Sequence, residues 1–241
     1  MKKDETFKWD DKKFVEFYAD SADIIILERQ RLIRLLLEIV YFHFPSLTGL
    51  NILDLGCGDG IISRHIYNTS PDNSFFLVDA SEEMLKKAKI HLSGANATYR
   101  HCTFQDFIAS KNEYNKYNLV FSANAVHHLD FTEKTELFGK VYKELQFGGL
   151  FLNIDPVHPN SAYSEEIQFE IWRNWMNEAL EGNGHKNDVG KYDTIPSMYK
   201  NNLENKPSSL WDQLEVLEKC GFRDVDCFYK YGIFSLFGGV K

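Results

Sequence analysis

The chain has 241 residues, of which 44% are apolar and 26% charged, a mixture typical of one globular domain with a full-sized core. Its formal net charge is −8 and its basic residues are interleaved with acidic ones, which argues against a nucleic-acid-binding protein. The four cysteines have no C-x-x-C spacing, so we expect free thiols in a reducing compartment and no metal site.

No targeting or membrane-spanning segment is expected. The opening stretch, MKKDETFKWDDKK, lacks the apolar core of a signal peptide and is polar enough to fray. The most apolar stretch, Leu32–Phe44, is interrupted by Arg34, Glu38 and His43, which a membrane span does not tolerate. These features predict a cytoplasmic protein.

A helical region is followed by an alternation of strands and helices. From Phe14 to about Phe44 the apolar residues recur at helical spacing, and Pro45 and Gly49 end the region. Five apolar runs then predict strands at Asn51–Leu55, Phe75–Asp79, Thr98–Cys102, Tyr117–Asn124 and Leu150–Asp155. The segments of helical character between them are Gly60–Tyr67, Ser81–His91, Asp106–Ser110 and Phe131–Leu145. This alternation predicts a parallel sheet with helices on both faces.

An insertion of about 50 residues, His158–Pro207, follows the fifth strand. Its first half predicts a helix, Ser164–Leu180, which carries Trp172 and Trp175 three residues apart on one face. Its second half contains EGNGHKNDVGKYD and predicts a flexible loop. Long loops in compact domains are often lids, so we expect this insertion to cover a binding site.

The C-terminal segment predicts a helix and a hairpin. Leu210–Lys219 has helical character and ends at Gly221, a residue suited to a left-handed cap. Arg223–Lys230 and Ile233–Val240 are strand-like runs separated by a tight turn, typical of an antiparallel hairpin. The predicted fold is therefore a doubly wound α/β domain with a mostly parallel seven-stranded sheet that the hairpin closes.

The first strand runs into a glycine-rich turn, Ile52–Gly60 (ILDLGCGDG). Its glycines let a ligand approach the main chain, and the helix that follows offers free N–H groups. Asp54, inside a buried strand, requires a partner, either main-chain N–H groups or, through water, a cationic amino group. Asp79 ends the next strand, where a carboxylate can accept hydrogen bonds from both hydroxyls of a ribose. Ile61 occupies the position at which a dinucleotide-binding G-x-G-x-x-G has its third glycine, which disfavours a dehydrogenase.

D-L-G-C-G-D-G followed by V-D-A-S-E-E-M-L resembles the class I, Rossmann-like methyltransferases that use S-adenosylmethionine, over residues 50–155 and 210–241. The resemblance implies that the glycines line the methionine part of the cofactor and that Asp79 holds the ribose. It also implies that Asp106 accepts from the adenine amino group beside Phe107, although Asp106 is equally suited to cap a helix. The cofactor-binding residues so predicted are Asp54, Gly56, Cys57, Gly58, Gly60, Asp79, Ala80, Met84, Gln105, Asp106, Phe107, Ser122, Ala123 and Asn124.

Methyl transfer from a sulfonium is an in-line displacement, which requires alignment of donor and acceptor and exclusion of water. A general base is required only if the acceptor loses a proton; His127 and His128, after the fourth strand, are candidates for that role or for support of the cofactor loop. The candidates for an acceptor pocket are Tyr18, Arg29, Trp172, Arg173, Trp175 and Tyr229. A solvated helix face for the arginines and core packing for the tryptophans are the alternative interpretations.

These observations favour a methyltransferase with a small-molecule acceptor, acting as a monomer or homodimer and releasing S-adenosylhomocysteine. The expected single domain consists of a helical cap (1–48), a cofactor-binding core (49–157), the lid insertion (158–207) and the closing helix and hairpin (208–241). A second hypothesis is an enzyme like the carboxy-S-adenosylmethionine synthases, which need an arginine facing the extra carboxylate, for which Arg173 and Arg29 are candidates. A third is a non-catalytic protein that binds S-adenosylmethionine.

Overall fold

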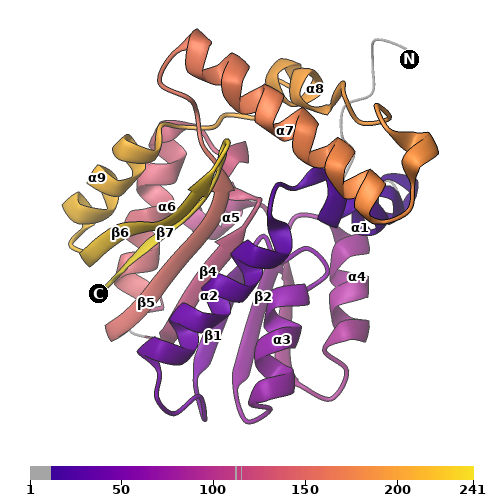
Figure 1. Ribbon diagram of the computed structural model, residues 1–241. Helices are drawn as coiled ribbons and strands as arrows, with labels where there is room; N and C mark the ends of the chain where they lie inside the picture. The colour runs from indigo at the N-terminus through magenta and orange to yellow at the C-terminus, as the bar shows by residue number, and fades with distance from the viewer. Residues whose placement is uncertain (1–11, 112, 115) are drawn as a thin grey trace.

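The computed structural model of the chain describes residues 12–111, 113–114 and 116–241 (Figure 1). The expectation that the first dozen residues fray lies almost wholly outside them. Seven strands form one sheet in the order β3-β2-β1-β4-β5-β7-β6. Their bounds are β1 Asn51–Leu55, β2 Ser74–Asp79, β3 Asn96–His101, β4 Tyr117–Ala123, β5 Leu145–Pro156, β6 Arg223–Tyr231 and β7 Phe234–Val240. This order confirms the predicted seven-stranded α/β fold.

The first five strands are parallel, and β7 runs antiparallel between β5 and β6, as the hairpin prediction requires. The chain order reverses at β1, which pairs with β2 on one side and with β4 on the other. The connections that leave β1 and β4 therefore cross to opposite sides of the sheet, and their departure opens a crevice at the carboxyl ends of these strands. The strand order alone therefore predicts that a ligand binds in this crevice.

Helices cover both faces of the sheet because alternate strand residues point to opposite sides. In β1, Ile52 joins the core beneath one set of helices, whereas Leu53 and Leu55 join the core beneath the other. The first set is α2 Arg29–His43, α3 Ile61–Thr69 and α4 Glu82–His91; the second is α5 Phe104–Ala109, α6 Phe131–Glu144 and α9 Leu210–Cys220. Ser81, the first residue of the predicted segment Ser81–His91, is the N-cap of α4, since its hydroxyl accepts from the Met84 N–H.

The N-terminal helical region consists of two helices, α1 Lys12–Ile25 and α2, where the apolar periodicity predicted one continuous region. Glu28 interrupts the helical conformation with a φ of +55°, a left-handed value that a helix interior does not contain. The break redirects the chain, so that α2 packs on the sheet while α1 packs against the insertion (Figure 1).

The insertion contains α7 Ala162–Gly182 and α8 Ile195–Asn201, which lie beyond the carboxyl ends of the parallel strands (Figure 1). The predicted helix is confirmed in α7, whereas the stretch predicted as a flexible loop includes a short 3₁₀ turn, Lys186–Asp188. The sequence missed α8 because seven residues with Pro196 in their first turn have too few positions to show a helical period. Across the described part of the chain, every helix is too short or too polar to cross a bilayer.

Candidate functional site

A cavity of about 880 Å³ opens at the carboxyl ends of β1, β2 and β4, and α1 and α2 form part of its wall. Ten of the fourteen residues predicted to bind a cofactor line it: Asp54, Gly56, Cys57, Gly58, Asp79, Ala80, Met84, Gln105, Ala123 and Asn124. Tyr18, Arg29 and His128 line the same cavity. Residues from strand ends, a glycine turn and the N-terminal helices therefore meet at the crevice that the strand order creates.

The glycine turn is held against β2 by its main chain. The N–H groups of Gly56 and Cys57 both donate to the carbonyl of Val78, at 2.8 and 3.0 Å. A Cβ on Gly56 would lie 2.4 Å from the Cβ of Ala125 and 3.3 Å from the ring of Phe104. Gly56 also has a φ of +66°, which side chains other than glycine rarely adopt. Glycine is therefore required at this position for packing and for conformation.

Asp79 is fixed by the turn in front of it and the helix behind it. Its Oδ2 accepts from the Gly58 N–H and its Oδ1 from the Ser81 N–H, each at 2.8 Å. Burial raises its pKa, and these main-chain bonds oppose that effect. A carboxylate has about four acceptor positions, so each oxygen retains capacity for a ligand hydroxyl. This arrangement suits the predicted ribose contact.

Asp54 has one hydrogen-bond partner from the neighbouring helix, since the Ser63 hydroxyl donates to its Oδ2 at 2.7 Å. Burial raises its pKa to about 8, and the nearby Asp79 and Asp59 add to the rise. A group with this pKa is mainly protonated at neutral pH and becomes a carboxylate when a cation approaches. Asp54 therefore supplies a negative charge to the cavity when a cation binds.

Acidic side chains outnumber basic ones around the cavity. Its carboxyl groups are Asp23, Asp54, Asp59, Asp79 and Glu204, and its permanent cations are Arg29 and Lys206. Arg29 already pairs with Asp23 at 2.6 Å. Burial raises the pKa of Tyr18 to about 12, so its hydroxyl remains protonated. Such a wall favours a ligand with net positive charge, such as a sulfonium compound with an ammonium group.

Four residues predicted to bind a cofactor do not line the cavity. Gly60 is the N-cap of α3, and a Cβ there would lie 3.2 to 3.3 Å from three apolar side chains. Ser122 is buried and donates to the Leu55 carbonyl at 2.6 Å. Phe107 packs in the core, while Phe104, which the sequence reasoning missed, lies on the cavity wall. The sequence T-F-Q-D-F does not indicate whether the ring of Phe104 or that of Phe107 faces the cavity.

The remaining residue of this set, Asp106, belongs to the first turn of α5, whose N-cap is Thr103. The Asp106 Oδ2 accepts from the Thr103 N–H at 3.4 Å, and the Thr103 Oγ1 accepts from the Asp106 N–H at 3.1 Å. In this reciprocal capping box Asp106 stabilises the start of the helix without being the N-cap residue itself. The neighbouring Thr103 and Gln105 line the cavity.

The two histidines have different surroundings. His127 is buried outside the cavity and its Nδ1 lies 2.8 Å from Oδ1 of Asp155, which is fully buried. His128 lines the cavity and donates from Nδ1 to the Glu204 carbonyl at 3.2 Å. Burial and the nearby His127 lower its pKa to about 3. His128 is thus neutral near pH 7 and accepts a proton only weakly.

The four candidates from the insertion and hairpin do not reach the cavity, so the structure does not place them in an acceptor pocket. Trp172 is 4% exposed and its indole N–H donates to the Ile25 carbonyl at 2.7 Å, which joins α7 to α1. Trp175 packs against the same core. Arg173 pairs with Glu170 one turn earlier on α7. Spacing along a helix identifies a shared face but not the neighbour that covers it.

Tyr229, the last of these candidates, lies on β6 at the edge of the sheet. Its hydroxyl accepts from the Arg31 guanidinium at 3.5 Å, and that guanidinium also lies over its ring. In place of these four side chains, Leu203, Glu204 and Lys206, from the chain between α8 and α9, line the cavity. No local pattern in the sequence marks these three residues.

Comparison with known proteins agrees with this geometry. Residues 52–149 match the family model of a methyltransferase domain. A carboxy-S-adenosyl-L-methionine synthase of Campylobacter jejuni subsp. doylei is 26% identical over 252 aligned residues, which cover 99% of each chain.

Solved structures show the same fold. Phosphoethanolamine N-methyltransferase 2 of Haemonchus contortus, in complex with S-adenosyl-L-methionine, has a TM-score of 0.54 and 23% identity over 79% of this chain. This chain spans only 37% of that protein. An O-methyltransferase family protein of Burkholderia thailandensis has a TM-score of 0.61 and 13% identity, covering 96% of this chain and 60% of its own. The strand order, the glycine turn and the matched domain lead to one conclusion: residues 52–149 match a methyltransferase domain, and the chain has the class I (Rossmann-like) fold of the S-adenosylmethionine-dependent methyltransferases.

Proposed function

We propose that this enzyme binds S-adenosylmethionine in the cavity and transfers its methyl group to a small-molecule acceptor. The observation that carries the proposal is the convergence of ten predicted cofactor residues on one cavity of about 880 Å³. Small-molecule sites span roughly 300 to 1,000 Å³, so this cavity, near the upper end of that range, has room for the cofactor and a small second ligand.

The side chains fit a cationic cofactor. Asp79 is held by two main-chain N–H groups in an orientation suited to the ribose hydroxyls. Asp54 lies at the inner end, where its carboxyl group suits the cofactor's ammonium group. The main chain of Gly58, with open space in front of it, and the half-buried ring of Phe104 provide the close approach and the apolar surface that the rest of the cofactor requires. These groups bind and orient, which is what displacement at a sulfonium demands of a protein.

The acceptor would lie against the walls that the predicted cofactor residues do not supply. These are the α1–α2 wall with Tyr18 and the Arg29–Asp23 pair, and the wall with His128 and Glu204. A neutral His128 is suited to orient an acceptor by hydrogen bonding. This assignment replaces the acceptor pocket that the tryptophans of the insertion suggested.

A second candidate function, a carboxy-S-adenosylmethionine synthase, is favoured by the 26% identity that extends over nearly the full length of both chains. It requires a cation for the additional carboxylate. Arg29 lies on the cavity wall, but Asp23 already neutralises it at 2.6 Å, and Arg173 lies outside the cavity. Because carboxyl groups around the cavity outnumber cations, they disfavour a second carboxylate on the cofactor, and we rank this function second.

Calorimetric titration tests the cofactor site. We expect the wild-type protein to bind S-adenosylhomocysteine and Asp79→Ala to lose at least about 100-fold in affinity, because the ribose contact and the orientation of the turn are lost together. Asp72→Ala, in the exposed turn before β2, is the matched control and should bind like the wild type. Near-normal affinity of Asp79→Ala would disprove the ribose assignment.

Mass spectrometry separates the two reactions. The ligand that co-purifies with the protein is released and weighed, and the protein is then incubated with S-adenosylmethionine and a small-metabolite extract. Methylated products and an unmodified cofactor support the first function. A carboxylated sulfonium that is retained by the wild type and lost in Arg29→Gln would instead establish the second.

A further inference from the structure

Helix α6 contains two lysines whose ammonium groups are withdrawn from solvent, Lys134 at 1% exposure and Lys140 at 4%. A buried ammonium is costly unless its N–H groups are satisfied. Lys140 pairs with Glu144 one turn later, at 2.9 Å, and donates to the Ser110 carbonyl at 3.0 Å. Lys134 differs in its partners, because its Nζ donates to the main-chain carbonyls of Leu129 and Lys206.

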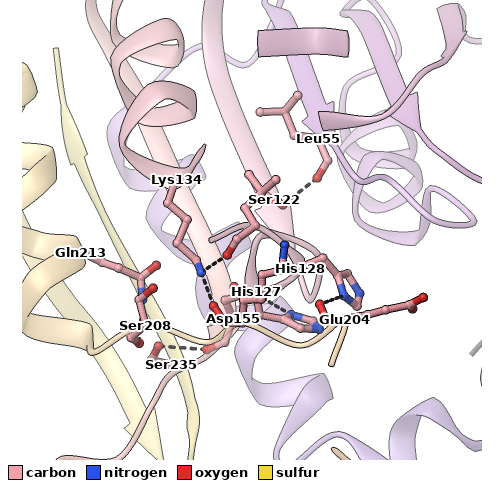
Figure 2. A network of polar contacts seen from close by, with 12 residues as sticks. Leu55, Ser122, His127, His128, Lys134, Asp155, Glu204, Ser208, Gln213 and Ser235 are labelled. Atoms are coloured by element: carbon pink, nitrogen blue, oxygen red, sulfur yellow. Dashed lines mark hydrogen bonds and ion pairs between the residues drawn. The ribbon is translucent and has the colours of Figure 1, made fainter. Parts of the chain in front are cut away.

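These two carbonyls belong to segments far apart in the sequence. Leu129 ends the segment that follows β4, and Lys206 lies in the connection between α8 and α9. Further bonds join the same segments: the Lys206 N–H donates to the His127 carbonyl at 2.7 Å, and His128 Nδ1 donates to the Glu204 carbonyl at 3.2 Å (Figure 2). The ammonium of Lys134 thus joins two segments that are already paired.

The segment held in this way is part of the cavity wall. Leu203, Glu204 and Lys206 line the cavity together with His128 and Leu129. Leu203 is 92% exposed, so it has little packing of its own to hold it in place. No residue of 203–206 is among those predicted to bind the cofactor. The 203–206 segment therefore faces the acceptor if the cofactor lies where it is proposed.

The surroundings of Lys134 set the strength of the link. Burial lowers its pKa to about 8, whereas the carboxylates of Asp155, Asp130 and Glu133 favour the charged form and Lys206 opposes it. Hydrogen bonds from a charged donor are stronger than those from a neutral one. Without the ammonium, the carbonyl of Leu129 and that of Lys206 would both lose a buried donor.

We propose that Lys134 is the positioning residue of the acceptor side of this site: its buried ammonium fixes the 203–206 segment as a wall of the cavity without contributing to the cofactor side. The identification of this wall with the acceptor rests on the proposed function. The link between Lys134 and the segment does not depend on it.

Hydrogen–deuterium exchange of the full chain, saturated with S-adenosylhomocysteine, tests the proposal. In Lys134→Met we expect the amides of residues 203–206 to exchange at least about tenfold faster than in the wild type. The dissociation constant of S-adenosylhomocysteine should change by less than about threefold, because its predicted contacts lie elsewhere. Lys134→Arg, which keeps a cation with several N–H donors, should restore most of the protection.

Lys140→Met is the matched control, since it removes a buried ammonium from the same helix, and its 203–206 segment should keep wild-type protection. If Lys134→Met does not fold, Lys134→Gln takes its place with the same expectation. Unchanged exchange in the Lys134 variants, or an equal increase in Lys140→Met, overturns the proposal. Failure of the wild type to bind S-adenosylhomocysteine overturns the proposed function instead, and exchange of the ligand-free protein then still tests the link.

Discussion

Gly56 and Gly58 provide a sharp test of the site, because the same substitution should have different consequences at two positions two residues apart. Both have left-handed conformations, with φ of +66° and +53°. A Cβ on Gly56 would lie 2.4 Å from the Cβ of Ala125, whereas a Cβ on Gly58 would have no heavy atom within 4 Å. Gly58 lines the cavity, so its new methyl group would occupy ligand space.

The magnitudes follow from these contacts. A left-handed conformation costs a residue with a Cβ about 1–2 kcal/mol, which both alanine variants incur. Ordinary carbon–carbon contacts are roughly 3.5–4.0 Å. Gly56→Ala must therefore displace its surroundings by more than about 1 Å, and such overpacking adds about 1–3 kcal/mol. We expect Gly56→Ala to lose about 2–5 kcal/mol of unfolding free energy and Gly58→Ala about 1–2 kcal/mol.

Urea denaturation measures the stabilities, and calorimetry measures the affinity of each variant for S-adenosylhomocysteine. Gly58→Ala should be the more stable variant and yet bind at least about tenfold more weakly than the wild type, because its methyl group occupies the position where the ligand approaches the main chain. Equal destabilisation of the two variants would refute the packing argument. Wild-type affinity in Gly58→Ala would show that the cofactor does not contact this turn.

Three further predictions concern buried side chains. Burial raises the pKa of Asp54 from its ordinary 3.8 to about 8 in the folded state, so the stabilisation from its bound proton is lost as pH rises from about 4 to about 8. Binding of a cationic ligand near pH 6.5 should therefore release a proton, which calorimetry in buffers of different ionisation enthalpy measures and which should be absent in Asp54→Asn. Burial lowers the pKa of His128 from its ordinary 6.5 to about 3 in the folded state, so this residue reduces the stability of the protein as pH falls from 6.5 toward 3. The unfolding free energies in urea at about pH 5 and pH 7.5 should therefore differ less for His128→Asn than for the wild type, and an equal difference would contradict the burial argument. Trp172→Ala should lower the unfolding free energy by about 3–5 kcal/mol, because the side chain is buried and hydrogen-bonded to the Ile25 carbonyl. Trp211 is exposed, so Trp211→Ala should change the unfolding free energy by less than about 0.5 kcal/mol. Similar losses in the two variants would disprove the structural role of Trp172.

Much of the cofactor side could be predicted from local sequence. Five apolar runs, each too short for a helix, and a C-terminal pair separated by a tight turn predicted the seven strands, whose order in the sheet came from the structure. The glycine turn and Asp79 come together because carboxyl ends of parallel neighbours share one edge of a sheet. Even Ser81 could be read in advance, since an N-cap depends on the next three residues alone.

The walls proposed for the acceptor became visible only in the tertiary structure. The helical spacing of α7 predicted that Trp172 and Trp175 share a face, but only the packing shows that α1 and the core cover this face. A lysine on an amphipathic helix reads as solvated, and only the return of the chain to Lys206, 72 residues later, makes Lys134 a buried donor. Local sequence determines backbone conformation and the spacing of apolar residues, each of which depends on only a few neighbouring residues. The contacts that close this cavity join segments whose separation no local pattern encodes.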